Sequence, residues 1–172
     1  VFLPAGEILT YEEIERVVRV FCGAGIRKVR LTGGEPLARK DIETLAGRLT
    51  ALDELDELTL TTNGLALEEK AAALARAGLG RVNVSLDTLH PDKFRTICRA
   101  GRLEKVLAGI RAARDAGLKP VKVNVVVMRG RNEGEIGDFL DFSVRERVIV
   151  RFIEYMPLKL DEDWKRRFVS RE

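Results

Sequence analysis

A short phrase that ends a helix and precedes a strand occurs three times in this sequence. Ala24-Gly25-Ile26, Ala77-Gly78-Leu79 and Ala116-Gly117-Leu118 each follow a segment with helical spacing of apolar residues, and each is followed by a run rich in valine or leucine. Glycine often takes the left-handed conformation that terminates a helix. A chain that alternates helix and strand in this way is expected to form βαβ units around a parallel sheet.

The expected strands cover residues 28–32, 57–64, 81–87, 121–128 and 148–156. Amphipathic helices are expected before and between them, because apolar side chains recur there at the spacing of one helix face. These side chains are Ile14, Val17, Val18 and Phe21, then Ile42, Leu45 and Leu49, then Val106, Ile110 and Ala113, and finally Ile136, Phe139, Leu140 and Val144. Thr10 and Glu13 are expected to form a capping box before the first helix, and Asp41 to cap the second.

The first predicted element is a helix with no strand before it, although a helix of a βα unit normally follows its strand. No linker or low-complexity segment divides the chain. The pattern predicts an α/β fold, a partial (βα) TIM-like barrel with parallel strands, helices outside and the first strand missing. Residues 1–172 are interpreted as a single domain, the central part of such a barrel, truncated at both ends.

Composition narrows the class of protein. Charged residues make up 33% and hydrophobic residues 45% of the 172 residues, as in a soluble globular domain. A net charge of +3 is too small to indicate nucleic-acid binding, and no apolar run approaches the roughly 20 residues of a membrane span. Neither Cys22 nor Cys98 has the spacing of a metal site, and both are expected to be packed and inert. We therefore expect a cytoplasmic protein with no nucleic-acid or membrane partner.

Alternation along the strands separates an aliphatic face from a polar face. In each of the first four strands, every second residue is aliphatic and the residues between them are mostly polar. The polar residues are Arg30 and Thr32 in the first strand, Thr59, Thr61 and Asn63 in the second, Asn83, Ser85 and Asp87 in the third, and Lys122 and Asn124 in the fourth. The aliphatic face is expected to meet the helices, so the polar face should line the interior and bind a polar ligand. Arg30 and Lys122 favour an anion there. A solvated polar face, and an ion pair of Lys122 with Asp87, are the alternatives.

The expected carboxyl ends of four strands carry turn sequences: GGEP, TTNG, SLDTLHP and EYMP. In barrels and open α/β sheets, ligands bind at this edge. Gly33 and Gly34 have no Cβ and let the backbone approach a ligand closely. Together the four turns indicate one binding site.

These motifs resemble the radical S-adenosylmethionine superfamily. The strand sequences VNVSLD, VKVN and RFIEYMP belong to the same superfamily pattern as TGGEP and TTNG. Within the superfamily, the stretches VFLP, EILTYEEIERVVRVF, RKVRLTGGEPLARKD, LTTNG and RFIEYMPL are similar to the GTP 3',8-cyclase family, and the likeness covers nearly the whole chain. The resemblance implies that Gly33, Gly34, Glu35 and Pro36 bind the methionine amino group of S-adenosylmethionine. It implies further S-adenosylmethionine contacts from Ser85 and Met156, and GTP contacts from Arg30, Thr61 and Lys122.

The same resemblance implies [4Fe–4S] clusters, whose first set of ligands is a CxxxCxxC loop that this chain lacks. No metal ligand and no catalytic residue is therefore assigned in this chain. The implied reaction converts GTP to 3',8-cyclo-7,8-dihydro-GTP by radical chemistry, the first step of molybdenum cofactor biosynthesis, with a reductant as partner. The 172-residue chain alone is expected to be inactive, and a homodimer is left open.

Two other functions remain open at this point. One is another radical S-adenosylmethionine enzyme, such as a peptide-modifying maturase, which would not need Arg30, Thr61 and Lys122 on one face. The other is a noncatalytic nucleotide-binding module built on a partial barrel.

Overall fold

The computed structural model describes residues 8–98, 101–156 and 162–170. Five strands form one sheet in the order β1-β2-β3-β4-β5, and every neighbouring pair is parallel. The strands are β1 (Lys28–Leu31), β2 (Glu57–Thr62), β3 (Arg81–Ser85), β4 (Lys122–Val127) and β5 (Ile149–Glu154). The predicted α/β class and parallel sheet are confirmed.

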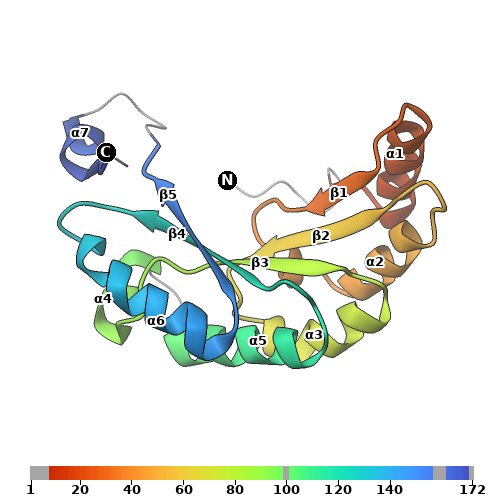
Figure 1. The fold of residues 1–172 in the computed structure, drawn as a ribbon. Coiled ribbons are helices and arrows are strands. Elements are labelled where there is room, and N and C mark those ends of the chain that lie inside the picture. Colours follow the sequence, from red (N-terminus) through yellow and green to blue (C-terminus); the bar gives the residue numbers. More distant parts are fainter. Residues whose placement is uncertain (1–7, 99–100, 157–161, 171–172) are drawn as a thin grey trace.

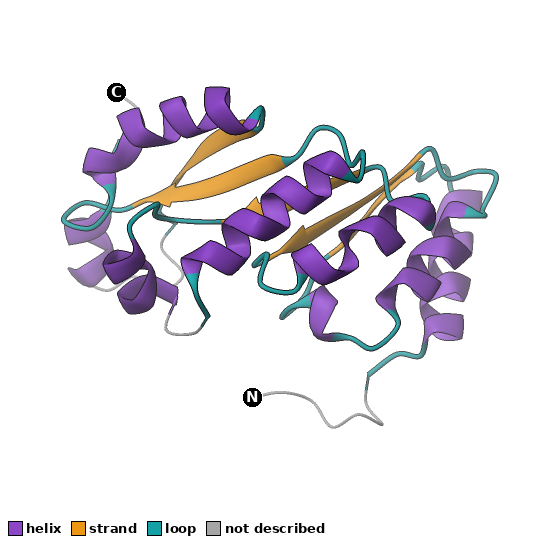
Figure 2. Cartoon of the chain, turned by 90° about the horizontal axis from the view of Figure 1, so that it is seen from below, coloured by secondary structure: helices purple, strands orange, loops and turns teal. Residues whose placement is uncertain are grey.

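Helices connect the strands and lie along one face of the curved sheet (Figures 1 and 2). They are α1 (Tyr11–Gly23), α2 (Ile42–Thr50), α3 (Leu67–Arg76), α4 (Pro91–Cys98), α5 (Leu103–Asp115) and α6 (Ile136–Glu146), with short 3-10 turns η2 (Pro36–Ala38) and η3 (Glu133–Glu135). The short helix α7 (Glu162–Arg167) lies apart from them, beyond the carboxyl end of β5 (Figure 1). The opposite, concave face of the sheet is therefore not covered by α1–α6.

The predicted parity of the strands is confirmed for β1 to β4. Val82, Val84 and Val123 are fully buried against the helices, with Leu60 of β2 beside them. Helix α5 packs closely on the turn between β2 and α3: a Cβ at Gly109 would lie 2.8 Å from the carbonyl oxygen of Gly64. Glycine at position 109 therefore allows this approach.

The two predicted helix caps differ in outcome. The capping box is present, because the Glu13 amide donates to Thr10 Oγ1 at 3.2 Å and the Thr10 amide donates to Glu13 Oε2 at 2.7 Å. Asp41 occupies the expected N-cap position of α2, but the expected side-chain cap is not formed. Asp41 has a left-handed backbone (φ 53°) and its side chain makes no capping hydrogen bond. The backbone at Asp41 turns the chain sharply into α2, so its side chain does not reach the helix amides.

Some apolar residues expected in the core are exposed. In α6, Phe139 and Phe142 are buried, but Ile136, Leu140 and Val144 are 41%, 55% and 81% exposed. Val17 and Phe21 of α1 are likewise exposed, while Val18 and Cys22 are buried. Helices α1 and α6 precede the two edge strands, β1 and β5, so each has a neighbouring helix on one side only. The apolar residues on their outer sides therefore stay exposed.

The strand after α3 is shorter than predicted, because Asp87 leaves the ladder. Its Oδ1 accepts the Val126 amide at 2.8 Å, and its backbone carbonyl accepts from Asn132 Nδ2 at 2.6 Å. These side-chain bonds replace ladder bonds, and β3 ends at Ser85. The expected packing of both cysteines is correct for Cys22 but wrong for Cys98, which is exposed.

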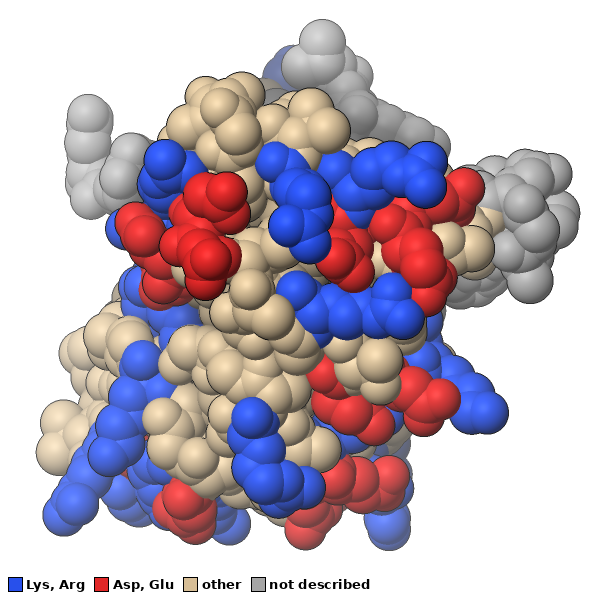
Figure 3. Space-filling view, turned by 90° about the vertical axis from the view of Figure 1, so that its right-hand side faces the viewer, with Lys and Arg blue, Asp and Glu red and all other residues tan. Residues whose placement is uncertain are grey.

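Ion pairs join neighbouring helices on the outside. Arg48 of α2 lies 2.7 Å from Glu12 of α1, and Lys70 of α3 lies 3.5 Å from Glu43 of α2. On the side that faces the viewer in Figure 3, Lys and Arg side chains are interspersed with Asp and Glu. None of the helices in the described ranges is long and apolar enough to cross a membrane.

Candidate functional site

The concave face of the sheet, here named the inner face, carries the polar residues that alternate with the buried aliphatic ones. The register places them in rows: Arg30, Thr59 and Arg81 form one row, Thr61, Asn83 and Lys122 a second, and Ser85, Asn124 and Arg151 a third. Neighbouring parallel strands lie about 4.8 Å apart, so the backbones of Thr61 and Lys122 are about 10 Å apart. The three residues predicted to contact GTP therefore share one face and adjacent rows.

The inner face is predominantly cationic. Burial lowers the pKa of Lys122, and the positive charges of Arg81, Arg151 and Arg30 lower it further, while Glu57 opposes the effect. Glu57 is itself paired with Arg81, with Nη2 and Oε2 3.1 Å apart. The alternative ion pair of Lys122 with Asp87 is not formed, because Asp87 accepts the Val126 amide instead. Cations held this close to one another favour an anionic ligand.

Arg151 belongs to the same site, although the sequence left the parity of its strand undecided. Its Nε and Nη2 donate to Asn124 Oδ1 at 2.9 and 2.7 Å, and Nη2 also donates to Asn83 Oδ1 at 3.2 Å. The next residue, Phe152, meets the ring of Phe139 of α6 edge-on, with ring centroids 6.2 Å apart. An aromatic residue facing a helix was the available signal that Arg151 faces inward.

The GGEP segment (residues 33–36) forms the turn that follows β1. The Glu35 carboxylate accepts three hydrogen bonds: from Thr62 Oγ1 at 2.6 Å, from the Asn63 amide at 2.7 Å and from the Leu37 amide at 3.0 Å. Glu35 therefore joins this turn to the end of β2. Gly33 has φ 141°, and nothing lies within 4 Å of the position that a Cβ would take there, so the backbone beside it is open to a ligand.

The other residues expected to bind S-adenosylmethionine lie at the same edge. Ser85 is the last residue of β3 and is exposed, and Met156 follows β5 with 66% of its surface exposed. Pro36 opens the η2 turn that follows the glycines. Exposed backbone at Gly33 and Gly34, an exposed hydroxyl and a thioether fit a ligand with an amino-acid part and an apolar part.

Buried polar residues that the sequence did not single out hold the neighbouring loops together. Glu135 is 1% exposed, and its carboxylate accepts from Thr88 Oγ1, the Leu89 amide and Lys93 Nζ, the last at 2.8 Å. Asn132 is 3% exposed, and its Nδ2 donates to the Asp87 carbonyl at 2.6 Å. These bonds tie the loop after β3 to the loop after β4. Polar residues in loops carry no periodic signal, so no pattern indicated them.

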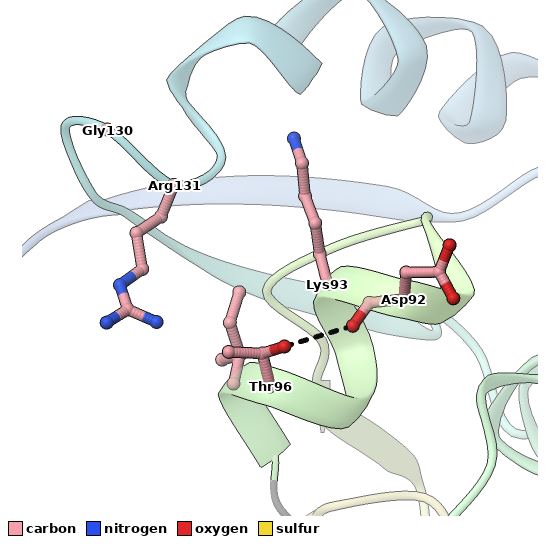
Figure 4. Close-up of a pocket in the computed structure, with 6 residues that line it drawn as sticks. Asp92, Lys93, Thr96, Gly130 and Arg131 are labelled. Carbon is pink, nitrogen blue, oxygen red and sulfur yellow. Dashed lines mark hydrogen bonds between the residues drawn. The ribbon is translucent and has the colours of Figure 1, made fainter.

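A separate pocket of about 310 Å³ lies between α4 and the turn after β4. Arg131 reaches toward α4 there, whereas Lys93 points away from the Arg131 guanidinium (Figure 4). Lys93 is paired with the buried Glu135, so its charge is already balanced. His90 lies just before α4 and is exposed, with Nε2 3.6 Å from Asp138 Oδ2. The inner face is therefore the better candidate for binding a polyanion.

The described residues contain no group of three or more His, Cys, Asp or Glu side chains that could hold a metal ion. Cys22 lies on the buried side of α1, and Cys98 is exposed at the end of α4. These residues do not fit a [4Fe–4S] cluster, which needs several thiolates together.

Comparison with known proteins agrees with this geometry. The radical SAM superfamily matches residues 2–143. The chain is 50% identical over 163 residues to the GTP 3',8-cyclase of Geobacter sulfurreducens, covering 95% of this chain and 50% of the relative. It is 54% identical over 157 residues to GTP 3',8-cyclase 1 of Pseudomonas aeruginosa, covering 91% of this chain and 48% of the relative. The chain thus spans about half the length of these relatives.

Solved structures show the same fold. The structure described as native anSMEcpe with bound AdoMet has a TM-score of 0.69 at 17% identity, covering 94% of this chain and 48% of that chain. The structure of TYW1 with a lysine-pyruvate adduct bound has a TM-score of 0.65 at 18% identity, covering 91% and 56%. The parallel sheet with its outer helices agrees with a partial TIM-like barrel. With a superfamily match over most of its length, the chain belongs to the radical SAM superfamily.

Proposed function

We propose that this chain is the central part of a GTP 3',8-cyclase, which converts GTP to 3',8-cyclo-7,8-dihydro-GTP at the start of molybdenum cofactor biosynthesis. The observation that carries the proposal is the inner face itself. Arg30, Thr61 and Lys122 lie there in adjacent rows, in a chain about 50% identical to proteins of that name. A peptide-modifying maturase or a plain nucleotide-binding module gives no reason for this cationic face together with that identity.

In the proposed enzyme, Arg30 and Lys122 bind the anionic phosphates of GTP, and Thr61 supplies a hydroxyl beside them. Arg151 adds a further positive charge on the same face. A multiply charged ligand would relieve the repulsion that lowers the pKa of Lys122. These contacts fix the substrate against the sheet, so the sugar is held in one orientation for reaction.

S-adenosylmethionine is proposed to bind at the carboxyl edge of the sheet. Gly33, Gly34, Glu35 and Pro36 form the turn for its methionine amino group, and Ser85 and Met156 make further contacts. When bound and reduced, this cofactor supplies a 5'-deoxyadenosyl radical that abstracts hydrogen. The residues of this chain position the two ligands next to each other, since the inner face and the carboxyl edge adjoin.

The iron–sulfur clusters of this family need ligands that the described residues do not supply. We therefore propose that residues 1–172 form one domain within a longer protein, and that other parts of that protein bind the clusters. The proposed partners are GTP and a reductant for the cluster, with neither nucleic acid nor membrane involved. The proposed location is the cytoplasm, and a homodimer is one form the assembly can take.

The proposal is tested with the complete protein that contains this chain, reconstituted with iron and sulfide without oxygen. With S-adenosylmethionine, GTP and a reductant, we expect cyclised GTP, detected by mass spectrometry. The 172-residue chain treated in the same way should give none. Replacement of Lys122 or Arg30 by Ala should weaken GTP binding more than S-adenosylmethionine binding, and Ser85→Ala should do the reverse.

The matched control is Lys105→Ala, which removes an exposed charge on the outer helix α5 and should change neither affinity. No cyclised GTP from the complete, cluster-loaded protein would reject the proposed reaction. Equal losses of both affinities in the Lys122 and Arg30 variants would reject the separation of the two ligand sites.

A further inference from the structure

A hydrogen-bonded chain of side chains crosses the inner face from β2 to β5. Asn83 Nδ2 donates to Thr61 Oγ1 at 3.4 Å, and Asn83 Oδ1 accepts from Arg151 Nη2 at 3.2 Å. Asn124 Oδ1 then accepts from both Nε and Nη2 of Arg151. Asn83 is 1% exposed and Arg151 is half-buried. The guanidinium is therefore held in one orientation by partners that are themselves fixed.

The partners of Arg151 are amides, whereas other arginines of this chain pair with carboxylates. Arg111 and Arg114 both bond to the buried Glu146, at 2.8 and 3.3 Å. Arg81, on the inner face itself, pairs with Glu57. An amide oxygen orients a guanidinium as well as a carboxylate does, but it leaves the positive charge unbalanced.

The pairing of Arg151 with amides rather than with a carboxylate does not favour folding. Asn124 and Lys122 are on the same strand and face, two residues apart, so the Arg151 guanidinium and the Lys122 ammonium are near neighbours, and each repels the other. An aspartate at position 124 would keep the acceptor and balance one of the two charges. Among the described residues, no carboxylate forms an ion pair with Arg151 or Lys122, and two neighbouring cations without such a partner are suited to a multiply charged anion. An arginine already fixed in place also loses less conformational entropy when the anion binds.

We propose that Asn124, with Asn83, is a positioning residue that holds the Arg151 guanidinium toward the anionic part of the substrate without neutralising it. The inference rests on the proposed function, in which that anion is the triphosphate of GTP. It assigns to these asparagines a role that a purely structural hydrogen bond would not have, because the neutrality of the amide is the property that matters.

The decisive variant is Asn124→Asp in the complete protein, because it separates the proposed positioning role of Asn124 from a purely structural one. Aspartate preserves the size and the acceptor, and it strengthens the bond to Arg151. We expect the melting temperature to be equal to or above that of the wild type. We expect the affinity for GTP to fall at least tenfold, with little change in the affinity for S-adenosylmethionine. The dependence of GTP affinity on salt should also become weaker, since one positive charge is lost from the site.

Two further variants complete the design. Asn124→Ala removes the acceptor and should lower both the melting temperature and GTP affinity. Lys105→Gln changes the net charge by the same unit as Asn124→Asp, but on the outer helix α5, and should leave GTP affinity unchanged. Inorganic triphosphate serves as a second probe, and its affinity should fall in Asn124→Asp by the same factor as that of GTP.

The outcomes distinguish this inference from the proposed function. If the wild type binds GTP and Asn124→Asp binds it equally well, the inference is wrong and the proposed function stands. If the wild type binds inorganic triphosphate but not GTP, the proposed substrate is wrong, and the effect of Asn124→Asp on triphosphate still decides the role of Asn124. If the wild type binds neither, both are wrong. A drop in the melting temperature of Asn124→Asp as large as that of Asn124→Ala would also contradict the inference.

Discussion

The hydroxyl of Thr62 donates a 2.6 Å hydrogen bond to the carboxylate of Glu35, 27 residues earlier in the chain. The same hydroxyl accepts the Gly64 amide at 3.0 Å, and the second carboxylate oxygen accepts the Asn63 amide. The turn after β1 and the turn after β2 are thus joined at the carboxyl edge of the sheet. The Glu35 carboxylate, which stands between Gly34 and Pro36 in the sequence, therefore has a structural role.

Loss of the hydrogen bond between Thr62 and Glu35 should change the shape of the turn after β1 and thereby weaken S-adenosylmethionine binding. Thr62→Val keeps the size of the side chain but removes the hydroxyl, and should cost about 1 kcal/mol of stability. Glu35→Gln places an amide donor where an acceptor is needed and should cost about 1–3 kcal/mol. Both changes should weaken S-adenosylmethionine binding, measured by calorimetry, more than GTP binding. An unchanged S-adenosylmethionine affinity in both variants would count against a role for this turn.

The pH dependence of GTP binding should depend on Lys122. Burial and the nearby arginines lower its pKa below 10.5, and a bound anion should raise it again. GTP affinity is therefore expected to fall as pH rises through the lowered pKa, and binding should be accompanied by proton uptake. Above about pH 8 the phosphates are fully ionised and do not contribute. Lys122→Arg stays protonated and should remove this fall, and a fall that persists in Lys122→Arg would assign it to another group.

Asp87 should reduce stability at neutral pH. Burial raises its pKa above 3.8, although the bond from the Val126 amide opposes the shift. The folded state therefore holds this proton more tightly than the unfolded state, and the contribution of Asp87 to stability falls as pH rises from 3.8 through the raised pKa. Asp87→Asn keeps an acceptor for Val126 and should melt at an equal or higher temperature at pH 7.

The gain from Asp87→Asn should shrink as the pH approaches 3.8, because the wild-type carboxyl is then protonated. A second measurement is available at Cys98: although the residue as a whole is exposed, partial burial of its thiol and the charge of Asp87 raise the thiol pKa. Removal of that charge should make Cys98 react faster with a thiol reagent near pH 8. A lower melting temperature at pH 7 with unchanged thiol reactivity would contradict this account.

Glu146, in contrast to Asp87, should stabilise the folded state at neutral pH. The hydrogen bonds from Arg111 lower its pKa below 4.5, against the effect of burial. Its stabilising effect is complete above pH 4.5 and is lost as the pH falls through the lowered pKa. Glu146→Gln should lower the free energy of unfolding at pH 7 by about 1–3 kcal/mol, since it removes charge-assisted bonds between α5 and α6. Urea unfolding at pH 7 and pH 3 checks this, and an equal loss at both values would be unexpected.

Much of the fold follows from patterns within short segments. Helix ends such as Ala77-Gly78, the capping box at Thr10, and the parity of residues like Arg30 and Lys122 depend on local backbone geometry, which the sequence alone determines. The residues expected to contact GTP therefore fall on one face in the structure. Their roles, and those of the residues expected to bind S-adenosylmethionine, remain proposals.

The tertiary structure decided the rest, because it depends on which segments meet. Phe139 is buried and Val144 is exposed, although both fit one amphipathic pattern, since only one side of α6 has a neighbour. The orientation of Arg151 depends on two asparagines from other strands, 27 and 68 residues away along the chain. Glu35 joins the two turns only because the end of β2 lies beside it in the folded chain. Interactions between distant segments leave no periodic signal in the sequence, so only the folded chain shows them.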